Sequence, residues 1–309
     1  MEKLLLIDAN SIIHRCYHAL PPLNSPLGEP SGALYGVSSI LLKIAQNNPP
    51  RYIAACFDRP EPTFRKEKYK EYKAQRPPAP SDLISQIVAA KDVFREFGIT
   101  VFESPGFEAD DIIATLASKF GGEEGIAVEI LTGDRDTLQL ISGEKITVRF
   151  FRKGISDTVL YNEEQVLKDF NLRPKQLIDY KILIGDPSDN IKGVEGIGPK
   201  TAQAILVRYG NLPSAIGDRS VDNKFRDKLP KSLEEIDLLR ELIMLRKDVP
   251  INQVETKDLM FDFHKEGLGK MFDVMGFESL KRRLLGESEA YKTLKTKPKQ
   301  PQSPQGKMF

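Results

Sequence analysis

The stretch GFEADDII, residues 106–113, places three carboxylates within four positions, directly before an apolar run with helical spacing. These acids are Glu108, Asp110 and Asp111. A helix N-terminus stabilises one or two acids by about 0.3–1 kcal/mol each, but three like charges at this spacing repel one another. The stretch therefore indicates a bound cation, whose remaining ligands must lie elsewhere in the chain.

Six further acids fit this expectation, because they close predicted strands, follow such an end closely, or stand in a later GDPSDN stretch. They are Asp8, Asp58, Asp134, Asp136, Asp186 and Asp189. The carboxyl ends of parallel strands line one crevice, the usual ligand site of such a sheet. A lone aspartate there is more often a turn or cap residue, but nine acids in one cleft without counter-charge would cost roughly several kcal/mol.

The ligand types predict which metal is bound. Carboxylate oxygens select hard cations. The three histidines are scattered and both cysteines, Cys16 and Cys56, stand in apolar stretches, so a zinc site is not expected. The number of acids predicts two Mg²⁺ or Mn²⁺ ions, and two such ions about 3.5–4 Å apart serve in-line displacement at phosphorus.

The predicted elements position these acids in a mostly parallel sheet flanked by helices, over residues 1–162. Strands and helices alternate along this part, which is typical of α/β folds. Strands are predicted at 3–8, 52–58, 100–104 and 127–134, a hairpin at 146–151 and 157–162 on the sheet edge, and helices at 31–45, 81–97 and 108–120.

From residue 163 to 287 the pattern predicts helices. Asn162 caps the first of them with Gln165 three positions on, and a second capping box opens at Ser232. The last apolar unit is 277–285. Residues 288–309 are rich in Lys, Pro and Gln, and are predicted to be disordered.

A basic segment, about 59–80, follows Asp58 and is predicted to arch over the crevice as a helix. Cations that grip phosphates, interleaved with tyrosines whose rings stack on bases, suit a single nucleic acid strand. A solvated helix face is the alternative. The residues expected to contact DNA here are Lys66, Lys70 and Arg76.

GVEGIGPKTAQAIL, residues 193–206, is not a P-loop, because Pro199 separates the glycine from Lys200 and no strand precedes it. It indicates a helix-hairpin-helix at about 175–209, in which glycines let backbone N–H groups approach a phosphate at a helix N-terminus. Such a module grips the duplex backbone without reading sequence. Its expected contacts are Gly196, Gly198, Lys200 and Thr201.

Composition sets the remaining limits. With 45 basic and 44 acidic side chains the net charge is +1, so bulk charge identifies no partner. Two cysteines in apolar stretches favour a reducing compartment, and no apolar run is long enough for a membrane span or signal peptide. A soluble, cytoplasmic monomer is predicted, with no membrane partner.

Several stretches resemble the 5′-nuclease family, which includes the 5′-to-3′ exonuclease domain that begins bacterial DNA polymerase I and the flap endonucleases. They are LLIDANSIIHRCYHALPPL, GEPSGALYG, FDRPEPTFRKEKYKEYKAQRPPAP, GFEADDIIATLA, LTGDRDTLQL, GDPSDNIKGVEGIGPKTA and the closing MGFESLKRRLL. The resemblance spans all but the tail and implies a PIN-like nuclease core. Ala9 and Lys192 depart from the family pattern, and neither change removes an expected ligand.

The resemblance implies a role for each site residue. The first metal would be held by Asp8, Asp58, Glu108, Asp110 and Asp111, and the second by Asp134, Asp136, Asp186 and Asp189. Arg15, Arg65, Tyr72 and Lys73 would lie around the scissile phosphate, and a K⁺ ion is expected at the hairpin.

The activity implied is two-metal hydrolysis of DNA phosphodiesters at a 5′ flap, nick or 5′ end, as in primer removal and repair. No polymerase portion follows Glu287, so the chain is expected to be either a free-standing nuclease or a fragment, and a separate DNA polymerase is a candidate partner. Alternatives are a non-catalytic DNA-binding module, a sheet-based ribonuclease, and a haloacid-dehalogenase-type phosphatase. The last would require an aspartate where Asn10 stands.

Overall fold

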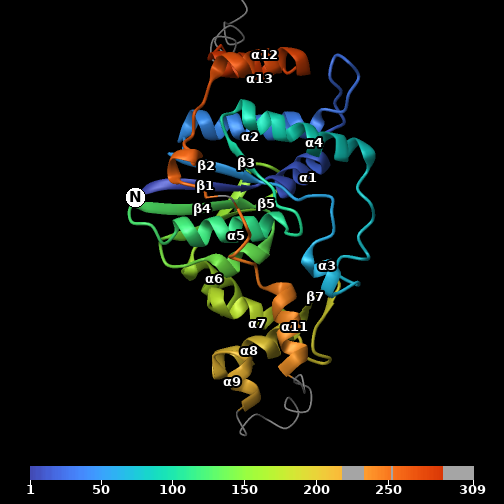
Figure 1. Ribbon diagram of the computed structural model, residues 1–309, viewed down its shortest axis with the longest axis vertical. Coiled ribbons are helices and arrows are strands. Elements are labelled where there is room, and N and C mark those ends of the chain that lie inside the picture. Colours follow the sequence, from blue (N-terminus) through green and yellow to red (C-terminus); the bar gives the residue numbers. More distant parts are fainter. Residues whose placement is uncertain (218–232, 252, 288–309) are drawn as a thin grey trace, which may run out of the picture.

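The computed structural model describes residues 1–217, 233–251 and 253–287, with helices stacked above and below a central six-stranded sheet (Figure 1). The strands are β1 Glu2–Asp8, β2 Tyr52–Cys56, β3 Thr100–Phe102, β4 Ile126–Thr132, β5 Ile146–Lys153 and β6 Asp157–Tyr161. Their order is β3-β2-β1-β4-β5-β6. All neighbouring pairs are parallel except β5–β6. The predicted parallel sheet with a hairpin at its edge is confirmed.

Helices cover both faces of the sheet, as the apolar strands require. Leu5 and Ile7 of β1 pack with α1 (Ala9–Ala19), α2 (Gly32–Asn47) and α4 (Ser81–Glu96). Leu4 and Leu6 point the other way, toward α5 (Ala109–Phe120). Helix α1 was not predicted from the sequence, although Ile12, Ile13 and Cys16 recur at helical spacing on its buried side.

The basic segment 59–80 is helical only in α3, Phe64–Lys68, so the prediction of a helical arch is wrong for most of its length. Tyr69 has extended dihedral angles (φ −135°, ψ 97°) that end the helix. Lys73 has a left-handed φ of 52°, and the prolines from Pro77 onward cannot donate backbone hydrogen bonds. The segment therefore continues as turns.

Below the sheet in Figure 1 lies a helical region. Its elements are α6 Glu163–Phe170, η2 Pro174–Gln176, α7 Leu177–Ile184, β7 Gly185–Asp186, β8 Ile191–Lys192, α8 Pro199–Tyr209, α9 Leu212–Gly217 and α11 Leu233–Ile243. The predicted cap holds, since Asn162 Oδ1 accepts from the Gln165 N–H at 2.8 Å. The helix-hairpin-helix is confirmed as α7 and α8, with Pro199 opening α8 and Gly196 at φ 74° between them.

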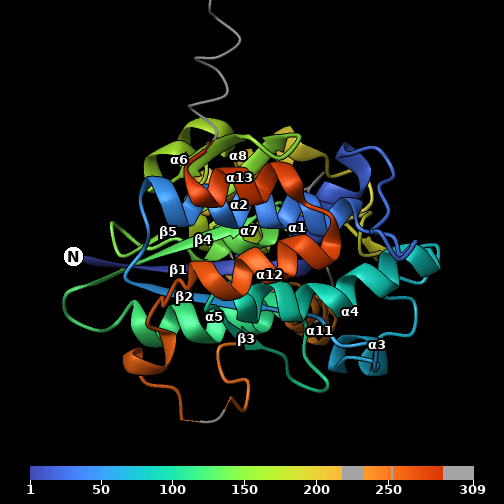
Figure 2. The same ribbon diagram turned by 90° about the horizontal axis from the view of Figure 1, so that it is seen from above.

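The chain then returns to the opposite end of the molecule through η3 Thr256–Leu259, α12 Lys265–Met275 and α13 Glu278–Leu285. These last helices lie over α2 in both views (Figures 1 and 2). Leu268, Phe272 and Leu280 join the apolar cluster of α2 and α4. The division predicted at residue 162 therefore does not hold for α12 and α13, which complete the first region.

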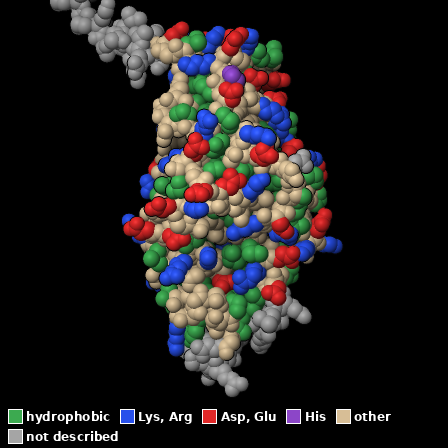
Figure 3. All heavy atoms as spheres, turned by 60° about the vertical axis from the view of Figure 1, so that its left-hand side comes forward, with side chains coloured by type: hydrophobic (Ala, Val, Ile, Leu, Met, Phe, Trp, Pro, Cys, Tyr) green, Lys and Arg blue, Asp and Glu red, His purple; other side chains and the backbone are tan. Residues whose placement is uncertain are grey.

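Two predictions, the capping box at Ser232 and disorder over 288–309, lie outside the described residues. Within them, no helix is long and apolar enough to cross a membrane. The face in Figure 3 intersperses Lys and Arg with Asp and Glu, in keeping with the net charge of +1. A basic surface for a partner must therefore be identified from local groups of Lys and Arg rather than from the net charge.

Candidate active site

The carboxyl ends of β1, β2 and β4 and the start of α5 border a cavity of about 240 Å³. Asn10, His14, Lys73 and Arg76 line it together with acids. Five of the nine predicted acids line it: Asp8, Asp58, Glu108, Asp110 and Asp134. These five acids meet at one rim as expected, whereas the other four of the nine do not line this cavity. Asp134, which the resemblance assigned to the second metal, lies with the first group.

Hydrogen bonds from the backbone fix these carboxylates in place. Asp8 accepts from the Ser11 N–H at 3.0 Å, which caps α1, and from Thr132 Oγ1 at 2.6 Å. Asp58 accepts from the Ala109 N–H at 2.8 Å. The acids are thus held by the first turns of α1 and α5, which lie next to the strand ends.

Among the described residues, the four aspartates of this cavity make no salt bridge, although Lys73 and Arg76 line it. Asp110 Oδ1 is buried without a hydrogen-bond partner there. Burial and then the charges of Asp8 and Asp134 hold the pKa of Asp110 well above its ordinary value. Burial likewise raises the pKa of Asp8 to about 7, despite its two hydrogen bonds. An orphaned carboxylate oxygen among like charges fits a hard divalent cation.

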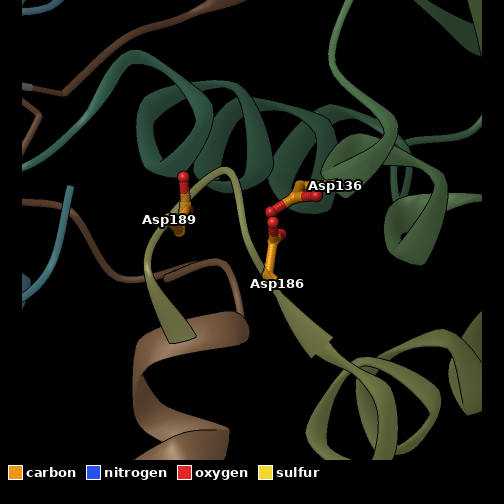
Figure 4. Close-up of side chains that lie close together, drawn as sticks. All are labelled: Asp136, Asp186 and Asp189. Atoms are coloured by element: carbon orange, nitrogen blue, oxygen red, sulfur yellow. The ribbon is translucent and has the colours of Figure 1, made fainter. Parts of the chain in front are cut away.

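A second acidic cluster adjoins the first. Asp136, Asp186 and Asp189 each offer an oxygen, and these oxygens lie within 4.8 Å of one another. Asp136 and Asp186 point toward each other, while Asp189 stands on the loop after β7 (Figure 4). Burial raises the pKa of Asp136 to about 7. Three converging carboxylates from two regions of the chain form a second candidate metal site.

The basic segment joins the two clusters. The Tyr72 hydroxyl lies 2.9 Å from Glu108 Oε2 and 3.0 Å from Asp189 Oδ2. Lys73 Nζ donates to Glu108 at 2.7 Å, and Arg76 donates to Asp189 at 2.7 Å. Tyr72 is buried, so its ring is not available to stack on a base. Its position between the clusters instead helps to fix Glu108 and Asp189.

The geometry does not favour the roles predicted for Asp111 and Arg65. Both side chains are buried, at 0% and 1% exposed. Arg65 donates to both Asp111 oxygens, at 2.6 and 2.8 Å, and the Glu108 and Arg246 N–H groups donate to them as well. With both oxygens and the guanidinium occupied, this pair is structural and anchors the basic segment to α5.

Arg15 and Lys66 also have intramolecular partners. Arg15 donates to the carbonyl oxygens of Phe151 and Gly154, both at 3.1 Å, and so braces the β5–β6 turn beside the cavity. Lys66 donates to the carbonyl oxygens of Lys70 and Tyr72, at 2.6 and 3.1 Å. Lys66 therefore stabilises the turn that carries Tyr72. This structural role differs from the simple DNA contact predicted for Lys66.

The other expected DNA contacts lie at the surface. Lys70 and Arg76 are exposed, as are Gly196, Gly198 and Lys200, while Thr201 is half-buried. A Cβ added at Gly198 would meet no atom within 4 Å. The first turn of α8 also leaves N–H groups without intrahelical acceptors. The hairpin therefore presents an open backbone surface, separate from the acidic cavity.

Four residues near the acids were missed by the sequence interpretation. Ser11 and Thr132 bind Asp8, and Asn10 Oδ1 accepts from the Asp58 N–H at 3.1 Å. Lys181 contacts Asp136 and Asp186. Lys181 alone carried a signal, as a cation within the apolar run LIDYKILIG, five positions before Asp186.

Asp110 and Asp111 are adjacent but should respond oppositely to loss of charge. Asp110→Asn replaces a buried carboxyl, whose pKa is raised in the folded state, by a neutral amide, so metal-free stability at neutral pH should rise by about 1–3 kcal/mol. Asp111→Asn weakens a buried ion pair and should lower stability by about 3 kcal/mol or more. Urea unfolding in EDTA measures both variants. A loss of stability in Asp110→Asn equal to that in Asp111→Asn would contradict this assignment.

The raised pKa values of Asp8 and Asp136 predict a pH-dependent stability. In the metal-free fold these carboxyls keep their protons up to about pH 7, whereas the unfolded chain releases them near 3.8. The folded state binds more protons in this window, so stability falls as pH rises through it. We expect Tm in EDTA to fall as the pH rises from about 5 to about 7 and to level off above that.

Mg²⁺ should remove most of this fall, because a divalent ion binds the ionised carboxylates. Asp8→Asn should flatten the profile in EDTA. Circular-dichroism melts across the range provide the measurement, and a Tm that rises with pH in EDTA would count against the buried acid cluster.

Comparisons with known proteins cover nearly the whole described chain. A model of the 5′-3′ exonuclease N-terminal resolvase-like domain matches residues 3–171. A model of the 5′-3′ exonuclease C-terminal SAM fold matches residues 172–265. The boundary between the two falls at the end of α6.

The relatives of this chain are named either 5′-3′ exonuclease or DNA polymerase I. The 5′-3′ exonuclease of Aquifex aeolicus is 37% identical over 256 residues, covering 82% of this chain and 86% of the relative. DNA polymerase I of Mycobacterium bovis is 39% identical over 284 residues, covering 91% of this chain and 31% of the relative. The chain thus spans about a third of the length of its polymerase relatives.

Solved structures share the fold. The T5 D15 protein co-crystallised with metal ions aligns with a TM-score of 0.62 at 23% identity, covering 93% of this chain and all of the other. The catalytic core of Rad2 in complex with DNA substrate aligns with a TM-score of 0.57 at 19% identity, covering 94% and 91%. With both domain models matched in succession, the chain belongs to the 5′-3′ exonuclease family.

Proposed function

We propose that this chain is a structure-dependent 5′-to-3′ exonuclease and 5′-flap endonuclease that hydrolyses DNA phosphodiesters with two divalent metal ions. The observation that carries the proposal is the buried acidic cavity at the strand ends, where Asp110 Oδ1 has no partner among the described residues. The adjoining triad of Asp136, Asp186 and Asp189 supplies a second set of oxygens. Mg²⁺ or Mn²⁺ suits both sets.

The residues that would hold the first ion are Asp8, Asp58, Glu108, Asp110 and Asp134, and those for the second are Asp136, Asp186 and Asp189. When bound, the ions supply an activated water and neutralise charge that develops on the phosphate. The protein keeps the carboxylates in position beforehand, through Thr132 and the first turns of α1 and α5. Preorganisation of this kind avoids rearrangement during the reaction.

Lys73 and Arg76 complete the cavity on the side of the basic segment. Lys73 is 27% exposed and is held by Glu108, so its charge lies at the rim where a scissile phosphate would enter. Arg76 is more exposed and binds Asp189. We assign Lys73 to the scissile phosphate and Arg76 to an adjoining phosphate of the same strand.

The helix-hairpin-helix would hold the duplex behind the cut. Gly196, Gly198 and the N-terminus of α8, with Lys200 and Thr201, would offer backbone donors and positive charge to one DNA strand. A K⁺ ion held by this hairpin would add further positive charge there. A 5′ flap or nick places a single strand at the basic segment and a duplex at this hairpin. Removal of primers and repair of nicks are the processes that produce such DNA.

The names of the relatives support this assignment and suggest a polymerase as the partner, either separate or continuous with the nuclease. A cytoplasmic monomer remains our prediction. The phosphatase alternative fits poorly, because Asn10 replaces the required aspartate and is engaged by the Asp58 N–H.

The metal requirement is tested with an end-labelled 5′-flap DNA. EDTA should abolish cleavage, and Mg²⁺ or Mn²⁺ should restore it. Asp134→Asn should lose cleavage while keeping or improving DNA binding, because less negative charge then faces the phosphates. Cleavage that persists in EDTA would overturn the proposal, as would parallel loss of binding and cleavage in a folded Asp134→Asn protein.

Lys73→Ala should lower the single-turnover rate on saturating 5′-flap DNA by about 10²–10³, the usual effect of removing one preorganised group in the transition state. Lys70→Ala is the matched control, because Lys70 is exposed and lies in the same segment. It should only weaken binding and lower the salt slope by about one. Equal small losses in both variants would reduce Lys73 to an ordinary surface cation.

Gly198→Val tests the hairpin. Because a Cβ at Gly198 meets nothing within 4 Å, the fold should survive while the added side chain keeps the backbone from a phosphate. Affinity for nicked duplex should drop for all sequences alike, with a smaller drop in Gly198→Ala. Fluorescence anisotropy on several duplex sequences measures this, and unchanged affinity would show that the hairpin does not contact DNA.

A further inference from the structure

Lys181 lies inside the second acidic cluster. It is carried by α7, in the helical region, and its Nζ bonds to Asp136 of the 3₁₀ helix Arg135–Leu140, where Asp136 is in the first turn. It also donates to Asp186 Oδ2 at 2.6 Å. The side chain is 21% exposed. One ammonium group therefore bridges two of the three carboxylates that converge at this site.

Asp186 Oδ1 and both oxygens of Asp189 also have donors. Asp186 Oδ1 accepts from the Ser188 N–H at 3.0 Å and from its hydroxyl at 2.6 Å. Asp189 binds Arg76 at 2.7 Å and lies 3.0 Å from the Tyr72 hydroxyl. Without any metal, this cluster is already compensated by cations and hydrogen bonds.

The first cavity is different. Among the described residues, no salt bridge reaches Asp8, Asp58, Asp110 or Asp134, and Glu108 is the one acid there that pairs with a cation. The aspartates of the first cavity have no internal cation as a salt-bridge partner, whereas the second cluster has Lys181. The two clusters should therefore differ in how readily they take up an ion.

We propose that Lys181 is a positioning residue that occupies the second cluster as an internal counter-cation and competes with the second divalent ion. This rests on the proposed two-metal function. Lys181 Nζ holds Asp136 Oδ1 and Asp186 Oδ2, so an ion that binds these two oxygens must displace it. The partial exposure of this flexible side chain gives it a route to solvent.

Competition between Lys181 and the ion affects both the metal-free and the metal-bound protein. With Lys181 in place, the metal-free acids of the two regions attract a common cation rather than repel each other. With the ion bound, the displaced ammonium loses a charge-assisted contact, and this loss weakens apparent ion affinity. Removing the ammonium should thus destabilise the metal-free protein and tighten binding of the second ion.

The experiment titrates Mn²⁺ into the full 309-residue chain without DNA, with calorimetry and electron paramagnetic resonance as readouts. Lys181→Met and the milder Lys181→Gln are compared with wild type, with Lys181→Arg as the conservative variant. Lys175→Met is the matched control, because Lys175 is an exposed lysine of the same region. Melts in EDTA accompany each titration.

In Lys181→Met and Lys181→Gln the dissociation constant of the second Mn²⁺ should fall about tenfold or more, the size expected for one charge-assisted contact. The first constant should stay unchanged and Tm in EDTA should drop. Lys181→Arg should bind the second Mn²⁺ as weakly as wild type, and Lys175→Met should match wild type in all measurements. A residue that was merely structural would weaken Mn²⁺ binding when removed, not strengthen it.

If wild type binds two Mn²⁺ ions and folded Lys181→Gln binds the second ion with unchanged or lower affinity, the role of Lys181 is overturned. The proposed function would remain intact. Failure of wild type to bind any Mn²⁺ would instead refute the proposed function.

Discussion

Repulsion between carboxylates at the strand ends is the constraint on which the rest of the structure depends. The ends of β1 and β4 and the start of α5 bring Asp8, Asp110 and Asp134 together, and burial and then neighbouring carboxylate charges raise the pKa values of Asp8 and Asp110. Such a cavity opposes folding, so it can persist only in a well-packed framework. The two apolar clusters on the faces of the sheet provide that framework.

The chain resolves this repulsion differently for different acids. Asp111 is neutralised within the core by Arg65, and this pair joins the basic segment to α5. Asp136 and Asp186 share Lys181, which joins the helical region to the sheet. Within the described part of the chain, the aspartates of the first cavity have no such salt-bridge partner. Counter-charges that stabilise the fold thereby also hold together the parts that, under the proposed function, act on one DNA molecule.

Much of this arrangement follows from sequence alone. Apolar periodicity predicted the sheet, and the placement of acids after strands predicted that Asp8, Asp58 and Asp134 meet. The pattern did not reveal that Asp111 points inward, because Asp110 and Asp111 look alike in sequence and differ only in where Arg65 lies in space. The course of segment 59–80 also escaped prediction, since Lys73 adopts a left-handed φ that its residue type does not favour.

The packing of α12 and α13 on α2 also bears on synthesis of the chain. Arg283 Nη1 reaches Ser39 Oγ across 244 positions of sequence, and Leu280 and Leu284 complete the apolar cluster built by α2 and α4. A chain emerging from the ribosome therefore exposes this side of its core until nearly the last described helix has appeared. The sheet and α5 can assemble first, so the nascent protein passes through a partly formed stage with an open apolar face, the kind of species that chaperones shield.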